Sequence, residues 1–95
     1  MQQFEVQTRA REEMIDITRE TAEAVSRSGV DEGMAFVYVP HTTAAVTVNE
    51  NADRDVQSDM LRHLRTLVPE DAAFRHAEGN SDGHLKATLV GSTST

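Results

Sequence analysis

The segment from Asp53 to Val68 is the feature that most constrains how this chain folds. Its apolar side chains recur at the spacing of a 3.6-residue helix and share one stripe, made of Val56, Met60, Leu64, Leu67 and Val68. Asp53 is placed to cap the first turn, and Pro69 follows the last one. The pattern predicts an amphipathic helix over 53–68. With 95 residues the chain has room for one core, so this helix belongs to a single domain.

Charge and cysteine content exclude several classes of function. Acidic residues outnumber basic ones 16 to 9, and the resulting charge of -7 repels nucleic acid and anionic membranes. The absence of cysteine excludes disulfides, thiolate metal sites and cysteine nucleophiles. No apolar run has the length of a membrane span, and the N-terminus has no signal pattern. We expect a soluble, cytoplasmic protein. Its low apolar content, 38%, is typical of chains that bury surface against partner subunits.

Three segments have the pattern of β-strands. Residues 4–8 alternate between apolar and polar side chains, which predicts a strand with one wet face. Residues 34–39 are apolar on both faces and predict a central strand that ends at Pro40. Residues 44–48 are rich in β-branched side chains and predict a second strand.

Two further segments have the pattern of helices. Residues 18–28 are strong helix formers, and Gly29 is placed to end that helix. A last helix is expected to begin at Asn80 or Ser81. A strand remains possible there, because Leu85, Ala87 and Leu89 also alternate.

The connection after the central strand is the first candidate site. His41 is followed by Thr42 and Thr43 in the gap between two apolar strands, where hydroxyls and free backbone amides gather. Asn49 and Glu50 leave the end of the next strand, where ligands commonly bind. His63 differs from His41, because it lies on the flank of the apolar stripe at a solvent edge.

Residues 76–84 form the second candidate site. His76 and His84 can converge only if the chain between them bends, which Gly79 and Gly83 allow. Glu78 or Asp82 is placed to orient an imidazole. A helix beginning at Asn80 or Ser81 would offer its free amides to a phosphate, with the Ser81 hydroxyl and Lys86 as further donors. An ordinary capped helix after a polar loop explains the same residues equally well.

Three motifs in this order resemble the YjbQ family, also labelled UPF0047. Residues 41–45 resemble the family's HTTA segment, residues 49–53 its NENAD segment, and residues 76–87 its HxEGNSDAHLKA segment. Gly83 stands where alanine is usual. Relatives in that family are associated with a secondary thiamine-phosphate synthase activity.

The resemblance implies a fold and an assembly. The implied α+β fold is a mixed β-sheet curled into a half-barrel with helices packed against it, assembled as a homotrimer. Members of the family are longer and continue through further strands. Residues 1–95 are therefore expected to form a single domain that lacks its C-terminal strands.

The resemblance also implies a pocket in which His41, His76 and His84 converge on a divalent metal ion, such as zinc, or on an oxyanion. These histidines and Glu78 would be catalytic. Thr42 and Thr43 would bind a small phosphorylated substrate, with the residues of the other two motifs, Asn49, Glu50, Asn80, Ser81 and Lys86. The implied reaction joins a hydroxymethylpyrimidine pyrophosphate with a thiazole phosphate. The alternatives are a non-catalytic trimer that binds metal or a phosphorylated metabolite, and polar segments that only join subunits.

Overall fold

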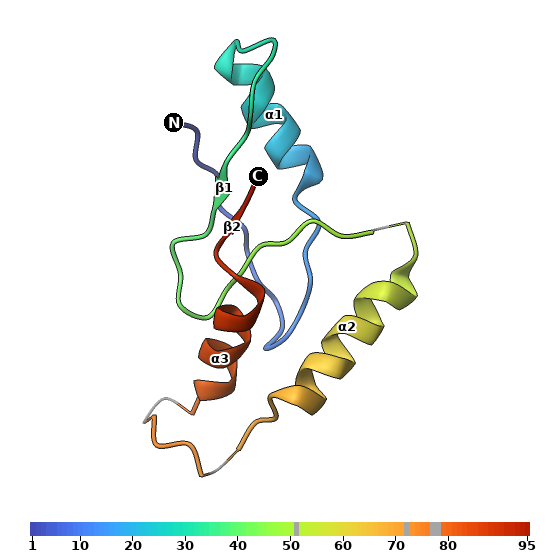
Figure 1. Ribbon diagram of the computed structural model, residues 1–95, viewed down its shortest axis with the longest axis vertical. Helices are drawn as coiled ribbons and strands as arrows, with labels where there is room; N and C mark the ends of the chain where they lie inside the picture. Colours follow the sequence, from blue (N-terminus) through green and yellow to red (C-terminus); the bar gives the residue numbers. More distant parts are fainter. Residues whose placement is uncertain (51, 72, 77–78) are drawn as a thin grey trace.

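The computed structural model describes residues 1–50, 52–71, 73–76 and 79–95, and these form an α+β fold (Figure 1). Its elements, in chain order, are α1 (Thr18–Ser28), β1 (Val37–Tyr38), α2 (Arg54–Leu67), α3 (Ser81–Val90) and β2 (Thr93–Ser94). The molecule is elongated, with extents of 50 × 30 × 21 Å. Helix α1 lies at one end, and α2 and α3 lie at the other, diverging from each other.

The three helices form where local signals predicted them. Gly29 ends α1 in a left-handed conformation at φ 74°, which glycine adopts without a steric penalty. The carboxylate of Asp53 caps α2 by accepting a hydrogen bond from the amide of Asp55. Helix α3 begins at Ser81, so the helix is confirmed for this segment and the alternative strand is wrong. Among the described residues, no helix has the length and apolar character needed to cross a bilayer.

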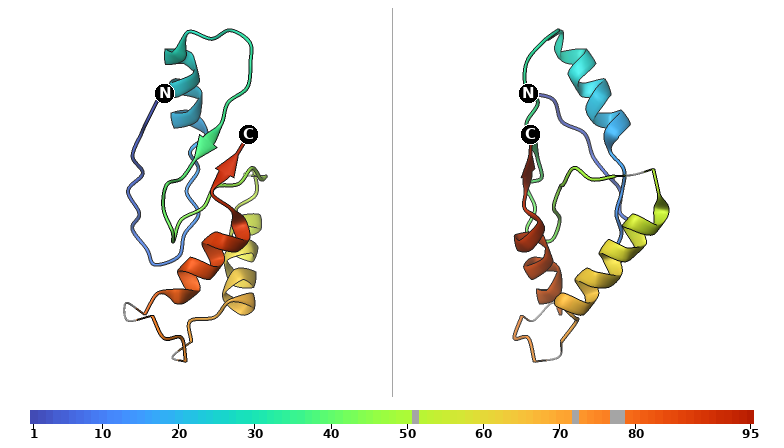
Figure 2. Two further views of the ribbon diagram at one scale, coloured as in Figure 1. Left: turned by 60° about the vertical axis from the view of Figure 1, so that its left-hand side comes forward. Right: turned by 45° about the vertical axis from the view of Figure 1, so that its right-hand side comes forward.

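The sheet consists of β1 paired antiparallel with β2, with Val37 opposite Ser94 and Tyr38 opposite Thr93. The pairing continues past the strands, because the amide of Val39 donates to the carbonyl of Ser92 at 2.9 Å. A further hydrogen bond, from the amide of Val46 to the carbonyl of Gly91 at 3.0 Å, ties the chain that leaves the turn to the residues between α3 and β2 (Figure 2). The turn between Val39 and Val46 is therefore anchored on both sides to the residues that follow α3.

The mixed half-barrel is not confirmed. Within the described part of the chain, the predicted strands over 4–8 and 44–48 form no ladder, and the central strand is reduced to Val37–Tyr38. Residues 4–8 are exposed. A strand is stabilised by the backbone and side chains of a neighbouring strand, and its own residue pattern cannot supply that neighbour.

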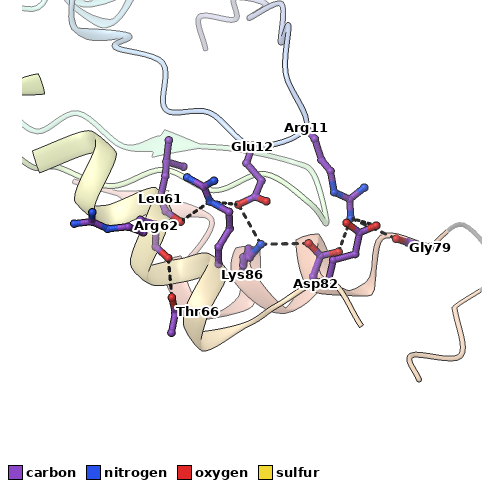
Figure 3. A network of polar contacts seen from close by, with 10 residues as sticks. Arg11, Glu12, Leu61, Arg62, Thr66, Gly79, Asp82 and Lys86 are labelled. Carbon is purple, nitrogen blue, oxygen red and sulfur yellow. Dashed lines mark hydrogen bonds and ion pairs between the residues drawn. The ribbon is translucent and has the colours of Figure 1, made fainter. Parts of the chain in front are cut away.

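Polar contacts tie the N-terminal segment to the helices. Among the described residues, Val68 is the one buried apolar side chain, at 9% exposed, whereas the carboxylate residue Asp82 is 2% exposed. Asp82 Oδ1 accepts a hydrogen bond from Arg11 Nη2 at 2.7 Å, and Asp82 Oδ2 accepts one from Lys86 Nζ at 3.2 Å (Figure 3). Glu12 Oε2 lies 3.3 Å from Lys86 Nζ and 3.6 Å from Nε of Arg65 on α2. We call these five residues the ion network.

The ion network also sets the ionisation of Asp82. Burial alone raises the pKa of this carboxyl group, but the hydrogen bond from Lys86 and the positive charges of Arg11 and Lys86 lower it. The amide of Gly83 lowers it further. The net result is a pKa below the ordinary value of 3.8, so Asp82 is ionised at neutral pH.

Candidate functional site

An open hollow lies between the turn that follows β1 and one face of α3, with a volume of about 390 Å³. The turn contributes His41, Thr42 and Ala44 to its lining, and the chain from α3 onward contributes His84, Ala87, Thr88, Gly91 and Ser92. Positions 84, 87, 88 and 91 follow the i, i+3, i+4, i+7 spacing of a single helix face. The small side chains on this face leave room beside His84. We call this space the histidine hollow.

A second hollow adjoins the first and shares lining residues with it. It is lined by Tyr38, Val39 and Pro40 of the strand end and shares His41, Thr42 and Ser92 with the histidine hollow. The imidazole of His41 thus stands between the two spaces. Thr42, Thr88 and Ser92 also line the histidine hollow, and the Thr88 hydroxyl donates to the carbonyl of His84 at 3.0 Å. Such convergence of a few polar groups is typical of ligand sites.

Local hydrogen bonds fix His41 in its turn. Its backbone amide donates to the carbonyl of Val39 at 2.9 Å, which closes a three-residue turn around Pro40. Its ring atom Nδ1 lies 3.0 Å from the amide nitrogen of Thr43 and 3.1 Å from the Thr43 hydroxyl. Both the backbone and the side chain of His41 are therefore held by neighbours in the same short segment.

His84 is half-buried on α3 and meets His76 as well as the hollow. The centres of the two imidazole rings are 5.1 Å apart, and the rings are nearly perpendicular, at 85°. His76 does not line the histidine hollow, which contains only His41 and His84 from the predicted set. Within the described residues, no group of three or more His, Cys, Asp or Glu side chains is placed to hold a metal ion.

The other residues predicted around the last helix lie outside the hollow. Lys86 is engaged in the ion network, and its side chain is 12% exposed. Asn80 is the N-cap of α3 and makes no side-chain capping bond, and Ser81 is the first residue of that helix. Thr43 packs beside His41 rather than lining the hollow. Glu78 lies outside the described residues.

Asn49 and Glu50 belong to the connection toward α2. The side-chain amide of Asn49 contacts the sulfur of Met60 at 3.5 Å, and its oxygen accepts a hydrogen bond from the amide of Glu50. Neither residue lines the hollow. Thr88 and Ser92 do line it, although no motif pointed to them. The position of Thr88, four residues after His84 on a predicted helix, was the one available signal.

Gly83 provides a test of how closely the turn packs on α3. A Cβ atom added at Gly83 would lie 3.6 Å from Thr43 Cβ, an ordinary van der Waals distance. Because alanine favours a helix over glycine, Gly83→Ala should raise the free energy of unfolding by about 0.5 to 1 kcal/mol. Urea denaturation measures this change. A loss of stability would show that the turn and α3 lie closer together than described.

The comparisons with known proteins decide the family. The model of the family "UPF0047 protein YjbQ-like" matches residues 2–95. The chain belongs to the UPF0047 family. It is 48% identical over 92 residues to UPF0047 protein MJ1081 of Methanocaldococcus jannaschii, covering 97% of this chain and 67% of that protein. It is similar to the crystal structure of a YjbQ/UPF0047 protein from Clostridium acetobutylicum, with a TM-score of 0.80 and 51% identity.

The UPF0047 chain described here is shorter than these relatives. It spans 62% of the Clostridium protein, and 84% of its own length is covered by that match. A YbjQ-like protein of unknown function from Sulfolobus solfataricus also shares the fold, with a TM-score of 0.78 and 29% identity. This match covers 84% of the present chain and 59% of the Sulfolobus protein.

These findings correct the predicted function. The relatives carry the name UPF0047 or are described as uncharacterised or of unknown function, and none of these names supports thiamine-phosphate synthesis. The predicted three-histidine pocket is also wrong, because His41 and His84 line the hollow whereas His76 contacts His84 and does not line it. The alternative of a non-catalytic trimer that binds metal or a phosphorylated metabolite loses the three-histidine pocket in which it was placed, whereas binding of either ligand is not tested by these findings. The motifs identified the family correctly, but the activity associated with it did not transfer.

Proposed function

We propose that this UPF0047 protein binds a small polar molecule in the histidine hollow. The observation that carries the proposal is that His41 and His84, from segments far apart in the sequence, line one space together with Thr42, Thr88 and Ser92. Five hydrogen-bonding side chains around one opening favour a ligand rich in oxygen or nitrogen atoms. The small side chains of Ala44, Ala87 and Gly91 leave space for it.

Imidazole adds a chemical capacity to this site. It is the side chain that most readily exchanges protons near neutral pH, so His84 is suited to act as an acid or base toward a bound ligand. The net charge of -7 repels anions at long range. Recognition of an anionic ligand, a phosphorylated metabolite included, would therefore depend on the local donors of the hollow.

Filling the hollow tests the proposal. Ala87→Leu places three extra carbon atoms on the wall beside His84 and keeps a strong helix former. We expect it to weaken binding of small polar compounds, identified by screening phosphorylated, carboxylated and neutral metabolites, by roughly tenfold or more. Ala22→Leu makes the same change on the exposed surface of α1 and should leave affinity unchanged. Calorimetric titration of both variants measures the difference.

Equal affinity in the two leucine variants would contradict the proposal, because binding would then occur outside the hollow.

Two earlier expectations, a divalent metal ion and a homotrimer, remain predictions that the fold and the comparisons do not test. Several large apolar side chains are exposed in the single chain, among them Met34, Phe36, Val48 and Leu89. Such exposure agrees with burial in an assembly.

A further inference from the structure

We propose that His41 is a fixed Nε2–H donor, which recognises an oxygen acceptor of the ligand and does not serve as a metal ligand. The part of this inference that concerns the ligand rests on the proposed function. The part that concerns the ring nitrogens rests on the turn alone. It replaces the metal role that the resemblance implied for this residue.

The donor assignment follows from the partner of Nδ1. A backbone amide has a hydrogen and no free acceptor, so the contact of 3.0 Å from the Thr43 amide to Nδ1 requires a lone pair on Nδ1. A neutral imidazole carries one hydrogen, which must then be on Nε2. The Thr43 hydroxyl, 3.1 Å from Nδ1, can donate to this nitrogen or accept from it, so the backbone amide alone decides the tautomer. The tautomer is inferred from this amide donor and not from an observed hydrogen on the ring.

The surrounding fold keeps this arrangement in place. The His41 amide is bonded to Val39, and Val39 is bonded to Ser92 at the end of the β1–β2 ladder. On the other side, Thr43 lies against the backbone of α3 at Gly83. The ring is therefore carried by a turn that is held between the sheet end and the helix. Within the described residues, Nε2 of His41 has no hydrogen-bond partner, so its N–H is available to a ligand in either adjoining hollow.

The same tautomer does not fit a metal site. A histidine ligand must offer a lone pair, and on His41 the free nitrogen carries a hydrogen. Moving that hydrogen to Nδ1 would set it against the Thr43 amide hydrogen and break the bond that orients the ring. The described residues also place no three ligand-type side chains together. An oxygen atom that accepts a hydrogen bond suits the site better than a cation.

The ring nitrogens can be observed directly. In protein with 15N-labelled histidine, at a mildly alkaline pH that keeps imidazoles neutral, two-bond 1H–15N correlation spectra distinguish a protonated ring nitrogen from a bare one. We expect His41 to show bare Nδ1 and protonated Nε2, both before and after addition of Zn²⁺. The reverse tautomer, an even mixture of tautomers, or a change of tautomer on adding Zn²⁺ would overturn the donor assignment. This readout needs no ligand and is independent of the proposed function.

Two substitutions separate the donor from the acceptor of His41. His41→Asn retains an acceptor near Nδ1 for the Thr43 amide and removes the Nε2–H donor, whereas His41→Gln extends an amide N–H toward the Nε2 position. The probe is sodium acetate, compared with sodium chloride at equal ionic strength, and the readout is the amide shifts of Thr88 and Gly91. We expect acetate affinity to fall roughly fivefold or more in His41→Asn and to be largely retained in His41→Gln.

Unchanged acetate affinity in His41→Asn would overturn the recognition role. Absence of any acetate effect on the unaltered protein would overturn recognition of an anionic oxygen while leaving the tautomer to the ring spectra. If the ring spectra contradict the donor assignment but acetate still binds in the hollow, the proposed function remains supported. The two ideas can therefore fail separately.

Discussion

Replacing Asp82 with asparagine should lower the free energy of unfolding by about 2 to 4 kcal/mol. The side chain of Asp82 is almost fully buried and is hydrogen-bonded to Arg11 and Lys86. An asparagine has one acceptor oxygen and no charge, so one of the two hydrogen bonds and both ion pairs of this buried carboxylate would be lost, while Arg11 keeps Glu70 and Lys86 keeps Glu12 as a partner. Because so little apolar surface is buried among the described residues, this ion network is a principal link between the N-terminal segment and α3.

A matched control is available on α2. Asp59 is 2.7 Å from Arg62, the same distance as Asp82 from Arg11, but both of these side chains are largely exposed. Asp59→Asn should change stability by less than about 1 kcal/mol, because water screens an exposed pair. Urea denaturation of the two variants side by side measures the difference. Similar losses of stability in both variants would show that the burial of Asp82 does not strengthen its ion pairs.

The pH dependence gives a second readout of the same prediction. The pKa of Asp82 is lower in the folded protein than its ordinary value of 3.8, so its contribution to stability is fully present above that value. The contribution is lost as the pH falls through the lower pKa of the folded state. The difference in stability between the unaltered protein and Asp82→Asn should therefore shrink at acidic pH. A difference that is constant through this range would contradict the assignment.

Replacing His84 with alanine should weaken binding of the ligand of the histidine hollow by about ten- to a hundredfold. The reason is that His84 is half-buried on the helix wall, so a ligand polar group that pairs with it would be left unsatisfied by alanine. Alanine favours the helical conformation, so α3 should still form. Calorimetric titration with the compounds retained from the Ala87→Leu experiment measures the loss.

His63 on α2 provides the control for this substitution. It is exposed and does not line the hollow, so His63→Ala should leave the affinity unchanged. Circular dichroism of both variants checks that the helices are intact. Full affinity in folded His84→Ala protein would exclude His84 from the site, and equal losses in both variants would point to a general effect of removing a histidine.

Local signals predicted the helices well, because a helix is formed by residues close in sequence. The apolar stripe and cap over 53–68 correspond to Arg54–Leu67, and the segment 18–28 ends at Gly29 as expected. The sheet was harder to predict, because pairing depends on residues far away in the chain. The segment 34–39 yields only Val37–Tyr38, and its partner, the short polar stretch Thr93–Ser94, has no strand pattern.

In the site, too, local sequence patterns predicted some features, whereas others depend on residues far apart in the chain. His41 and His84 were both predicted, and the fold brings them to one hollow. Lys86 was predicted to bind phosphate, but the fold brings Glu12 from the N-terminal segment to its ammonium group, a contact that no local pattern contains. The spacing of Asp82 and Lys86, four residues apart, did carry a signal for their pairing. Thr88 and Ser92 enter the hollow only because the end of α3 lies against the turn.

The most direct test of the account is to map where a ligand binds. Backbone amide shifts of the 15N-labelled protein, recorded during titration with the tightest compound from the metabolite screen, identify the residues at the site. We predict that the largest changes fall on residues 41–44 and 84–92. Changes concentrated around residues 49–53, on α2, or spread evenly over the surface would contradict the histidine hollow as the site.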